Sequence, residues 1–370
     1  MKFTVSTTSL LKHLQLLSGA VGSSKTSPIS ENFIFHITDG TLRITATDME
    51  TSMSSELDII ADEDGNVAIP AKMLLDILKS LPDQPLTFKI SETYSVEILA
   101  KSGKYKLAGQ EADAFLDLME MGEAETLSLS SNALSYAISK TVFAAGTDDL
   151  RPAMTGVYVH TDSNKLIFVA TDAQKLARFS FEDDQTKPEL AFILPRKALN
   201  TLKGALPNND TEVRLSYNPS HAFFSFEGIK LICRLIDARF PDYKVAIPLN
   251  NENHLFIDRA ELLASIKRLS IFANKNNYQI VLDITADQLK LQTQDPDYAN
   301  EASEKLDCRY EGDDMQIAFN ARYLAELVGA IDSEEVQFDL SAPNRAAILM
   351  PPNQSQEENL MLLIMPLLIM

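Results

Sequence analysis

This sequence of 370 residues contains few cysteines and only short apolar runs, and its net charge is negative. Only two cysteines occur, Cys233 and Cys308, and their surroundings are unrelated. Such a small number argues against a disulfide framework and favours a reducing compartment. We expect both cysteines to be isolated, buried thiols.

Apolar stretches are too short or too interrupted to cross a membrane. Lys12, His13 and Gln15 break the apolar pattern near the N-terminus, which is untypical of a signal peptide. The apolar segment 360–370 has 11 residues and contains Pro366, whereas a spanning helix needs about 20 residues. The sequence therefore predicts a soluble, cytoplasmic protein without a membrane partner.

Acidic residues outnumber basic ones by 52 to 33, which gives a formal net charge of −19. A surface with this excess does not attract nucleic acid indiscriminately. The hydrophobic content of 45% is that of a globular protein, and the length suits two or three domains. Any contact with nucleic acid must therefore come from a local basic surface.

The chain repeats itself at a spacing near 124 residues. Ile69, Leu194 and Phe319 open three similar segments and stand 125 residues apart. A second set alternates apolar and polar residues, as half-buried strands do; it comprises 40–50, 164–174 and 287–297. A third set reads as a Ser, Thr or Asp cap before a leucine-rich helix; it comprises 5–14, 129–138 and 257–266.

This period is far longer than the units of about 20–50 residues found in solenoids. Each repeat is therefore predicted to be a domain, with bounds 1–122, 123–248 and 249–370. The segments that begin at Val5 and Ile69 share one template at an offset of 64 residues, so each domain should contain two similar units. We expect an α+β fold in which every domain packs two helices on antiparallel sheets.

Positive charge is concentrated on the six predicted helices, 7–18, 71–80, 131–143, 196–205, 259–273 and 321–331. Lysine is common on any solvated helix face, but glutamate is an equally good helix former. The favoured interpretation is a shared helical surface that contacts the phosphates of a polyanion without reading its sequence. The basic residues are Lys12, Lys72, Lys79, Lys140, Arg196, Lys197, Lys203, Arg259, Lys267, Arg268 and Arg322.

Signatures of catalysis are missing from the sequence. The five histidines are scattered without metal-ligand spacing, and neither a phosphate-binding loop nor a nucleophile elbow occurs. Two acidic pairs, Asp148-Asp149 and Asp313-Asp314, leave a hydrolase as one alternative. A β-rich adaptor without a nucleic-acid partner is a second alternative. We expect no metal and no cofactor.

A Thr-Asp pair recurs at the end of two predicted strands, at 47–48 and 171–172. Catalytic groups rarely repeat in this way, whereas aspartate often stabilises turns. The pairs are therefore interpreted as turn residues.

Several segments together resemble the bacterial DNA sliding clamps, the β subunits of DNA polymerase III. They are MKFTVSTTSLLKHLQLLSG at the start, the Ala-Thr-Asp motifs at 46–48 and 170–172, LPRKAL at 194–199, DARFPDYK at 237–244 and Met365-Pro366. The resemblance covers essentially the whole chain. It implies a non-catalytic processivity factor that forms a head-to-tail homodimer, a ring with helices lining its hole and sheets outside.

The ring implied by this resemblance encircles double-stranded DNA. Its implied partners are the polymerase III α subunit, the clamp loader, other polymerases and repair proteins. The DNA contacts that the resemblance implies are Ser24, Lys25, Lys72, Arg151, Arg196 and Lys197. Family members often have arginine near position 24, where Lys25 is the nearest cation in this chain.

The resemblance also implies an apolar groove between the second and third repeats, which takes leucine and aromatic side chains of short client peptides. The implied walls are Met154, Thr171, Leu176, Pro241, Val245, Leu363, Met365, Pro366 and Leu367, with Arg151 and Lys175 on the rim. Two departures from the family pattern affect this groove. Ala173-Gln174-Lys175 replaces the common Gly-His-Arg, and 367–370 lacks the usual arginine and is one residue longer.

For the subunit interface, the resemblance pairs the edge of the first repeat with the edge of the third. The implied contacts are Tyr105 and Leu107 against Ile271 and Phe272. Lys104 and Lys106 could pair with Glu301 and Glu304. Exposed ion pairs contribute about 0–1 kcal/mol each, so the apolar contacts should dominate.

Overall fold

The computed structural model describes residues 1–22, 28–112, 124–182, 190–355 and 358–369. The chain forms two compact units. The first consists of Met1–Ser135 and Leu194–Leu235, and the second of Tyr136–Ile193 and Ile236–Met370. The second repeat therefore contributes to both units. Strand pairs are antiparallel in both units, as the α+β prediction requires.

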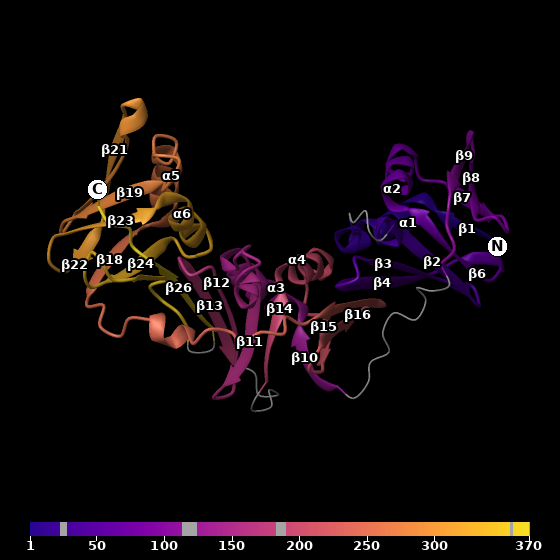
Figure 1. Cartoon of the computed structure of the whole chain (residues 1–370), viewed down its shortest axis with the longest axis horizontal. Coiled ribbons are helices and arrows are strands. Elements are labelled where there is room, and N and C mark those ends of the chain that lie inside the picture. Colours follow the sequence, from indigo (N-terminus) through magenta and orange to yellow (C-terminus); the bar gives the residue numbers. More distant parts are fainter. Residues whose placement is uncertain (23–27, 113–123, 183–189, 356–357, 370) are drawn as a thin grey trace. The chain divides into compact units, whose positions relative to one another are not determined.

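The first unit contains two sheets, with orders β5-β1-β7-β8-β9 and β10-β15-β16-β17-β4-β3-β2-β6 (Figure 1). Pairing of β17 with β4 joins the first two repeats in one sheet. The strands are β1 (Lys2–Ser6), β2 (Asn32–Thr38), β3 (Thr41–Thr47), β4 (Thr51–Asp58), β5 (Ile60–Glu63), β6 (Gly65–Pro70), β7 (Pro85–Ile90), β8 (Ser95–Ala100), β9 (Gly103–Ala108), β10 (Glu125–Ser130), β15 (Glu212–Tyr217), β16 (His221–Phe226) and β17 (Ile229–Arg234). Its helices are α1 (Thr7–Leu17), α2 (Ala71–Ser80) and α4 (Arg196–Ala205).

The second unit also contains two sheets, with orders β14-β11-β12-β13-β26-β25-β24-β18-β22 and β21-β20-β19-β23. The strands are β11 (Gly156–Asp162), β12 (Lys165–Thr171), β13 (Lys175–Glu182), β14 (Ala191–Pro195), β18 (Asn253–Asp258), β19 (Gln279–Ile284), β20 (Gln288–Asp295), β21 (Asn300–Asp307), β22 (Arg309–Glu311), β23 (Met315–Asn320), β24 (Glu335–Leu340), β25 (Ala347–Met350) and β26 (Glu358–Ile364). Its helices are α5 (Arg259–Leu269) and α6 (Ala321–Gly329), while α3 (Ser131–Thr141) and β14 cross between the units.

Each of the helices α1 to α6 begins at the residue that follows a strand. Ser6, Asp258 and Asn320 cap α1, α5 and α6, because their side chains accept hydrogen bonds from first-turn amides. The duplicated strand–helix template is thus confirmed. Pro70 and Pro195 precede α2 and α4 as N-cap residues and do not lie in the first turn.

Helices α1, α3, α5 and α6 end one to four residues before the predicted bounds. Short 3₁₀ turns at Ser18–Ala20 and Val142–Ala144 follow α1 and α3 directly. After α5, the amide of Ser270 donates to the carbonyl of Ile266 and closes the last turn. The apolar pattern continues through these turns, which explains why the sequence suggested longer helices.

The predicted alternating strands are β3, β12 and β20. Leu42, Ile44 and Ala46 of β3 are fully buried, as the period of two requires. Cys233 is buried as expected, but Cys308 is only half-buried because it lies between the edge strands β21 and β22. Burial raises the pKa of the Cys233 thiol to about 12, so this thiol stays protonated at neutral pH. Among the described helices, none is long and apolar enough to cross a membrane.

Candidate functional site

The second Thr-Asp pair shapes the turn between β12 and β13. The Asp172 carboxylate accepts hydrogen bonds from the two amides that follow Ala173, both at 2.9 Å, and the Thr171 hydroxyl accepts from the Ala173 amide at 3.1 Å. Asp48 makes the same bonds after β3. The residues at the tips, Met49 and Ala173, have φ values of 78° and 76°. Turn stabilisation by these aspartates is therefore confirmed.

The turn leads into the strand that joins the second repeat to the third. β13 and β26 lie side by side in Figure 1. They pair from Lys175 to Phe181, with Leu176 opposite Leu363. The Met365 amide extends this ladder by donating to the Gln174 carbonyl at 2.9 Å. Two segments nearly 190 residues apart in sequence are thus adjacent strands of one nine-stranded sheet.

An apolar cluster, here called the seam cluster, lies at this junction. Its buried members are Ile167, Val169, Leu176, Ile193, Phe240, Tyr243, Ala346 and Leu363, with Ala153, Tyr158, Ile236, Ile247 and Met361 packed against them. Leu176 and Leu363, two predicted groove residues, are therefore parts of one buried floor. Phe240 stacks on Tyr158 with ring centroids 4.8 Å apart.

The other predicted groove residues follow members of the seam cluster or their packing partners in sequence. Met154, after Ala153, and Pro241, after Phe240, are half-buried. Val245 and Met365 are exposed by 81% and 39%. Thr171 is buried, because its hydroxyl donates to the Lys175 carbonyl at 2.7 Å. An apolar floor flanked by exposed apolar side chains can hold leucine or aromatic anchors.

Lys175 does not lie on the rim as expected, since its side chain is only 6% exposed. Its ammonium donates to the Glu326 carboxylate, lies 3.5 Å from Asp172 and sits 4.5 Å above the Tyr323 ring. Two of these three partners belong to α6. Because β13 runs beside β26, the lysine points toward this helix and away from solvent.

Lys140 was counted with the polyanion-facing cations, and this interpretation is wrong. Its ammonium is buried, donates to the Ala330 carbonyl and lies 2.7 Å from the Asp332 carboxylate. The Tyr136 hydroxyl donates to the same carboxylate at 3.0 Å; burial and this bond raise the Tyr136 pKa. Lys175 thus binds α6, and Lys140 binds the turn that follows α6. Both lysines attach this part of the third repeat to the second repeat.

The C-terminal tail connects the two sheets of the second unit. The Leu367 amide donates to the Ala318 carbonyl of β23 at 2.7 Å. The Gln279 side-chain amide donates to the Leu368 carbonyl, also at 2.7 Å. Pro366 and Leu367 are half-buried, so the predicted groove residues of the tail are held in place by backbone bonds.

In the first unit, the predicted DNA contacts lie on helices that pack together. α1 contacts both α2, which carries Lys72, and α4, which carries Arg196 and Lys197. Lys72 and Lys197 are exposed and Arg196 is half-buried. The Lys197 ammonium pairs with the Asp48 carboxylate of the turn after β3. Ser24 and Lys25 lie outside the described residues.

In the second unit, Arg151 is exposed and pairs with Asp148 at 2.9 Å. Asp148 also accepts from the Leu150 amide, so it stabilises a turn. In the part of the chain that the structure describes, no group of histidines, cysteines or acids could hold a metal ion.

The residues predicted for the subunit interface differ in exposure. Ile271 and Phe272 are exposed by 68% and 41%, and Tyr105 is half-buried. Leu107 is buried in its own chain, because the alternation of β9 turns it toward the core. It is therefore not an outward-facing residue in this structure.

Two of the four charged residues predicted to pair across the interface have partners in their own chain. Lys104 pairs with Glu97 at 2.6 Å. Glu304 binds Arg268 at 2.6 Å and accepts from the Ser265 hydroxyl at 2.7 Å. These pairings were missed because their partners lie on neighbouring strands or on a helix. Lys106 lies opposite Glu97 and, in addition to the bond from Lys104, helps to lower the pKa of that carboxyl, whereas Glu301 has no ion-pair partner among the described residues.

Models of the DNA polymerase III β subunit match three consecutive segments. The N-terminal domain matches residues 1–119, the central domain 128–242 and the C-terminal domain 244–367. The chain belongs to the β sliding clamp family. This clamp is the processivity factor and a non-catalytic subunit of the DNA polymerase III holoenzyme, which decides against the hydrolase and the adaptor.

Curated relatives match over nearly the whole chain. The β sliding clamp of Escherichia coli K12 is 30% identical over 342 residues, covering 92% of this chain and 93% of the relative. The β sliding clamp of Pseudomonas putida KT2440 is 30% identical over 354 residues, covering 94% and 95%.

Solved clamps have the same fold. The clamp of Bartonella birtlesii bound to griselimycin aligns with a TM-score of 0.94 at 27% identity, covering 100% of both chains. The clamp of Pseudomonas aeruginosa bound to griselimycin aligns with a TM-score of 0.92 at 28% identity and the same coverage. The clamp fold with three repeated domains is therefore confirmed.

Proposed function

We propose that two copies of this chain close head-to-tail into a ring that encircles duplex DNA in the cytoplasm. The observation that carries this proposal is the succession of three clamp domains in one chain. We infer domain bounds of 1–122, 123–248 and 249–370 from the sequence repeat. A two-fold axis would relate two identical interfaces, each including Tyr105, Ile271 and Phe272.

The DNA contacts proposed are Ser24, Lys25, Lys72, Arg151, Arg196 and Lys197. Ring closure links the protein to DNA by topology, so these contacts can stay weak and independent of sequence. The Lys197–Asp48 pair supports this role, because an exposed lysine held by one carboxylate can exchange it for a phosphate. The acidic remainder of the surface disfavours DNA binding elsewhere.

The client groove proposed has the seam cluster as its floor. Its walls are Met154, Thr171, Leu176, Pro241, Val245, Leu363, Met365, Pro366 and Leu367. Clients are the polymerase III α subunit, the clamp loader, other polymerases and repair proteins, each through a short peptide. Lys175 acts by fixing the β13–β26 junction and does not contact the peptide. Since related clamps are bound to griselimycin, we propose that this chain binds it too.

Retention on DNA tests the ring. The clamp is loaded by its clamp loader onto nicked circular DNA, and half of the sample is then cut once with a restriction enzyme. Gel filtration should recover the clamp with circles but not with linear DNA, because only open ends allow it to slide off. Equal retention on both DNA forms, or on neither, would refute the proposed ring.

A further inference from the structure

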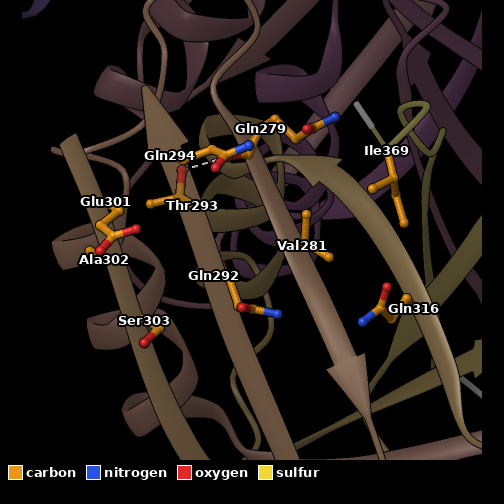
Figure 2. A pocket seen from close by; sticks show the side chains of 10 residues that line it. All are labelled: Gln279, Val281, Gln292, Thr293, Gln294, Glu301, Ala302, Ser303, Gln316 and Ile369. Carbon is orange, nitrogen blue, oxygen red and sulfur yellow. Dashed lines mark hydrogen bonds between the residues drawn. The ribbon is translucent and has the colours of Figure 1, made fainter. Parts of the chain in front are cut away.

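A cavity lies on the face of the sheet β21-β20-β19-β23 that is opposite α5, within the second unit (Figure 2). Its volume is about 450 Å³, which falls in the range of ligand sites. We call it the glutamine cavity, because Gln279, Gln292, Gln294 and Gln316 line it. None of these residues belongs to the groove proposed above.

The chemistry of this cavity suits a peptide backbone. In the described chain, the side chains of Gln292, Gln294 and Gln316 have no hydrogen-bonding partner. Each amide group offers two donors and one acceptor, the complement of a main-chain amide. Val281 and Ile369 add apolar contact at the centre and at one wall (Figure 2).

The C-terminal tail contributes residues both to the proposed client groove and to the cavity. Met365 to Leu367 form part of the proposed groove, and Ile369, two residues later, lines the glutamine cavity. The hydrogen bond from Gln279 to the Leu368 carbonyl fixes the segment between them. A client peptide that left the proposed groove along the tail would therefore reach the cavity.

Charge restricts the occupant. Among the described residues that line the cavity, Glu301 is the only one with an ionisable side chain. It lies on the edge strand β21 and was predicted from the sequence as a partner for a lysine across the subunit interface. The rest of the lining is neutral. An acidic segment would be repelled by Glu301 and by the net charge of −19, and the lining itself offers a basic segment a single carboxylate.

We propose that the glutamine cavity binds an uncharged extended segment, rich in serine and glutamine, of the same client whose leucine and aromatic anchors fill the groove. This inference rests on the proposed groove. The sheet β21-β20-β19-β23 would then be a second contact site for clients. This site would select among clients by the residues that flank their anchor motif.

Fluorescence anisotropy with synthetic peptides tests this. One peptide carries the leucine and phenylalanine anchors alone, and two more add a six-residue Ser/Gln extension at one end or the other, about 20 Å when extended. The fourth and fifth peptides carry an Asp/Glu extension of the same length at one end or the other. We expect one Ser/Gln peptide to bind about three- to tenfold tighter than the anchors alone, the size of one or two net hydrogen bonds.

The double variant Gln292→Ala/Gln316→Ala should remove this gain and keep the affinity for the anchors alone, which also shows that it is folded. Gln288→Ala, on the same strand but outside the cavity, should keep the gain. The inference is overturned if neither Ser/Gln extension helps, if the Asp/Glu extensions help equally, or if the double variant keeps the gain. Failure of the anchors alone to bind would instead refute the groove.

Discussion

At the scale of single residues, Ala173 has a strained backbone conformation. Its φ of 76° is a left-handed conformation, which costs a residue with a Cβ about 1–2 kcal/mol. Glycine, which lacks a Cβ, adopts such angles freely. The hydrogen bonds to Thr171 and Asp172 hold the strained alanine in place.

Replacing this alanine should therefore stabilise the protein. Ala173→Gly relieves the strain but adds flexibility to the unfolded chain, so we expect a net gain of about 0.5 kcal/mol. Urea unfolding measures the free energy. Ala177→Gly is the control, because Ala177 is a buried strand residue and its replacement should destabilise. A loss of stability in Ala173→Gly would contradict the strain argument.

His160, which packs beside the seam cluster, makes the stability of the folded chain depend on pH. Its ring stacks on Tyr158 at 4.8 Å, and Nε2 lies 3.0 Å from the Tyr243 hydroxyl. Desolvation lowers its pKa below the usual value of about 6.5. The unfolded chain therefore takes up a proton at this residue at a higher pH than the folded chain. The stability that neutral His160 contributes is complete above about pH 6.5 and is lost as the pH falls below it.

We predict that His160→Gln makes the free energy of unfolding fall less steeply between about pH 7 and pH 5. His13 provides a comparison, because desolvation lowers its pKa too. His13→Gln should remove a separate part of the slope, and the double variant should remove both parts. Chemical unfolding at a series of pH values measures the slope. An unchanged slope in His160→Gln would show that this histidine does not titrate differently in the folded chain.

At the scale of elements, local sequence patterns predicted the features that are determined by residues close together in the chain. The strand–helix junctions, the buried face of β3 and the Asp172 turn all follow from residues a few positions apart. The partners of the buried lysines do not. Lys140 and Lys175 bind residues 192 and 151 positions away. Lys140 stands between the polar residues Ser139 and Thr141, so its immediate neighbours gave no sign that it is buried.

Deletions in the C-terminal tail can separate its proposed role in peptide binding from its effect on stability. Deleting 366–370 removes one wall of the proposed groove, so client-peptide binding should be lost. It also removes the hydrogen bonds of Leu367 to β23 and of Gln279 to Leu368. Losing two hydrogen bonds should also lower stability by about 1–3 kcal/mol. Peptide binding by anisotropy and dimer mass by sedimentation are the measurements, and the dimer should persist.

A shorter deletion controls for this. Removing 368–370 keeps Met365, Pro366 and Leu367, so the anchor motif should still bind. Undiminished affinity after the longer deletion would rule out the tail as a groove wall. Equal loss in both deletions would place the anchor site further along the tail than proposed.

At the scale of the whole molecule, the exposed cations on the helices contrast with the acidic net charge. The chain is strongly acidic, yet Lys72 and Lys197 are exposed on packed helices. Lys140 is buried and pairs with Asp332, and Arg268 pairs with Glu304. Fewer cations remain than the sequence suggested, which fits a clamp that must slide and should not grip.

Ring closure gives the last prediction. Ile271 and Phe272 expose apolar surface that a single chain leaves uncovered, and burying a charge there without a partner is costly. Phe272→Asp should therefore yield a monomer by sedimentation and abolish retention on circular DNA. It should keep peptide binding, because all residues of the proposed groove belong to one chain. Ile60→Asp, on exposed β5, should leave mass and retention unchanged. A Phe272→Asp protein that still dimerises would place the subunit interface elsewhere.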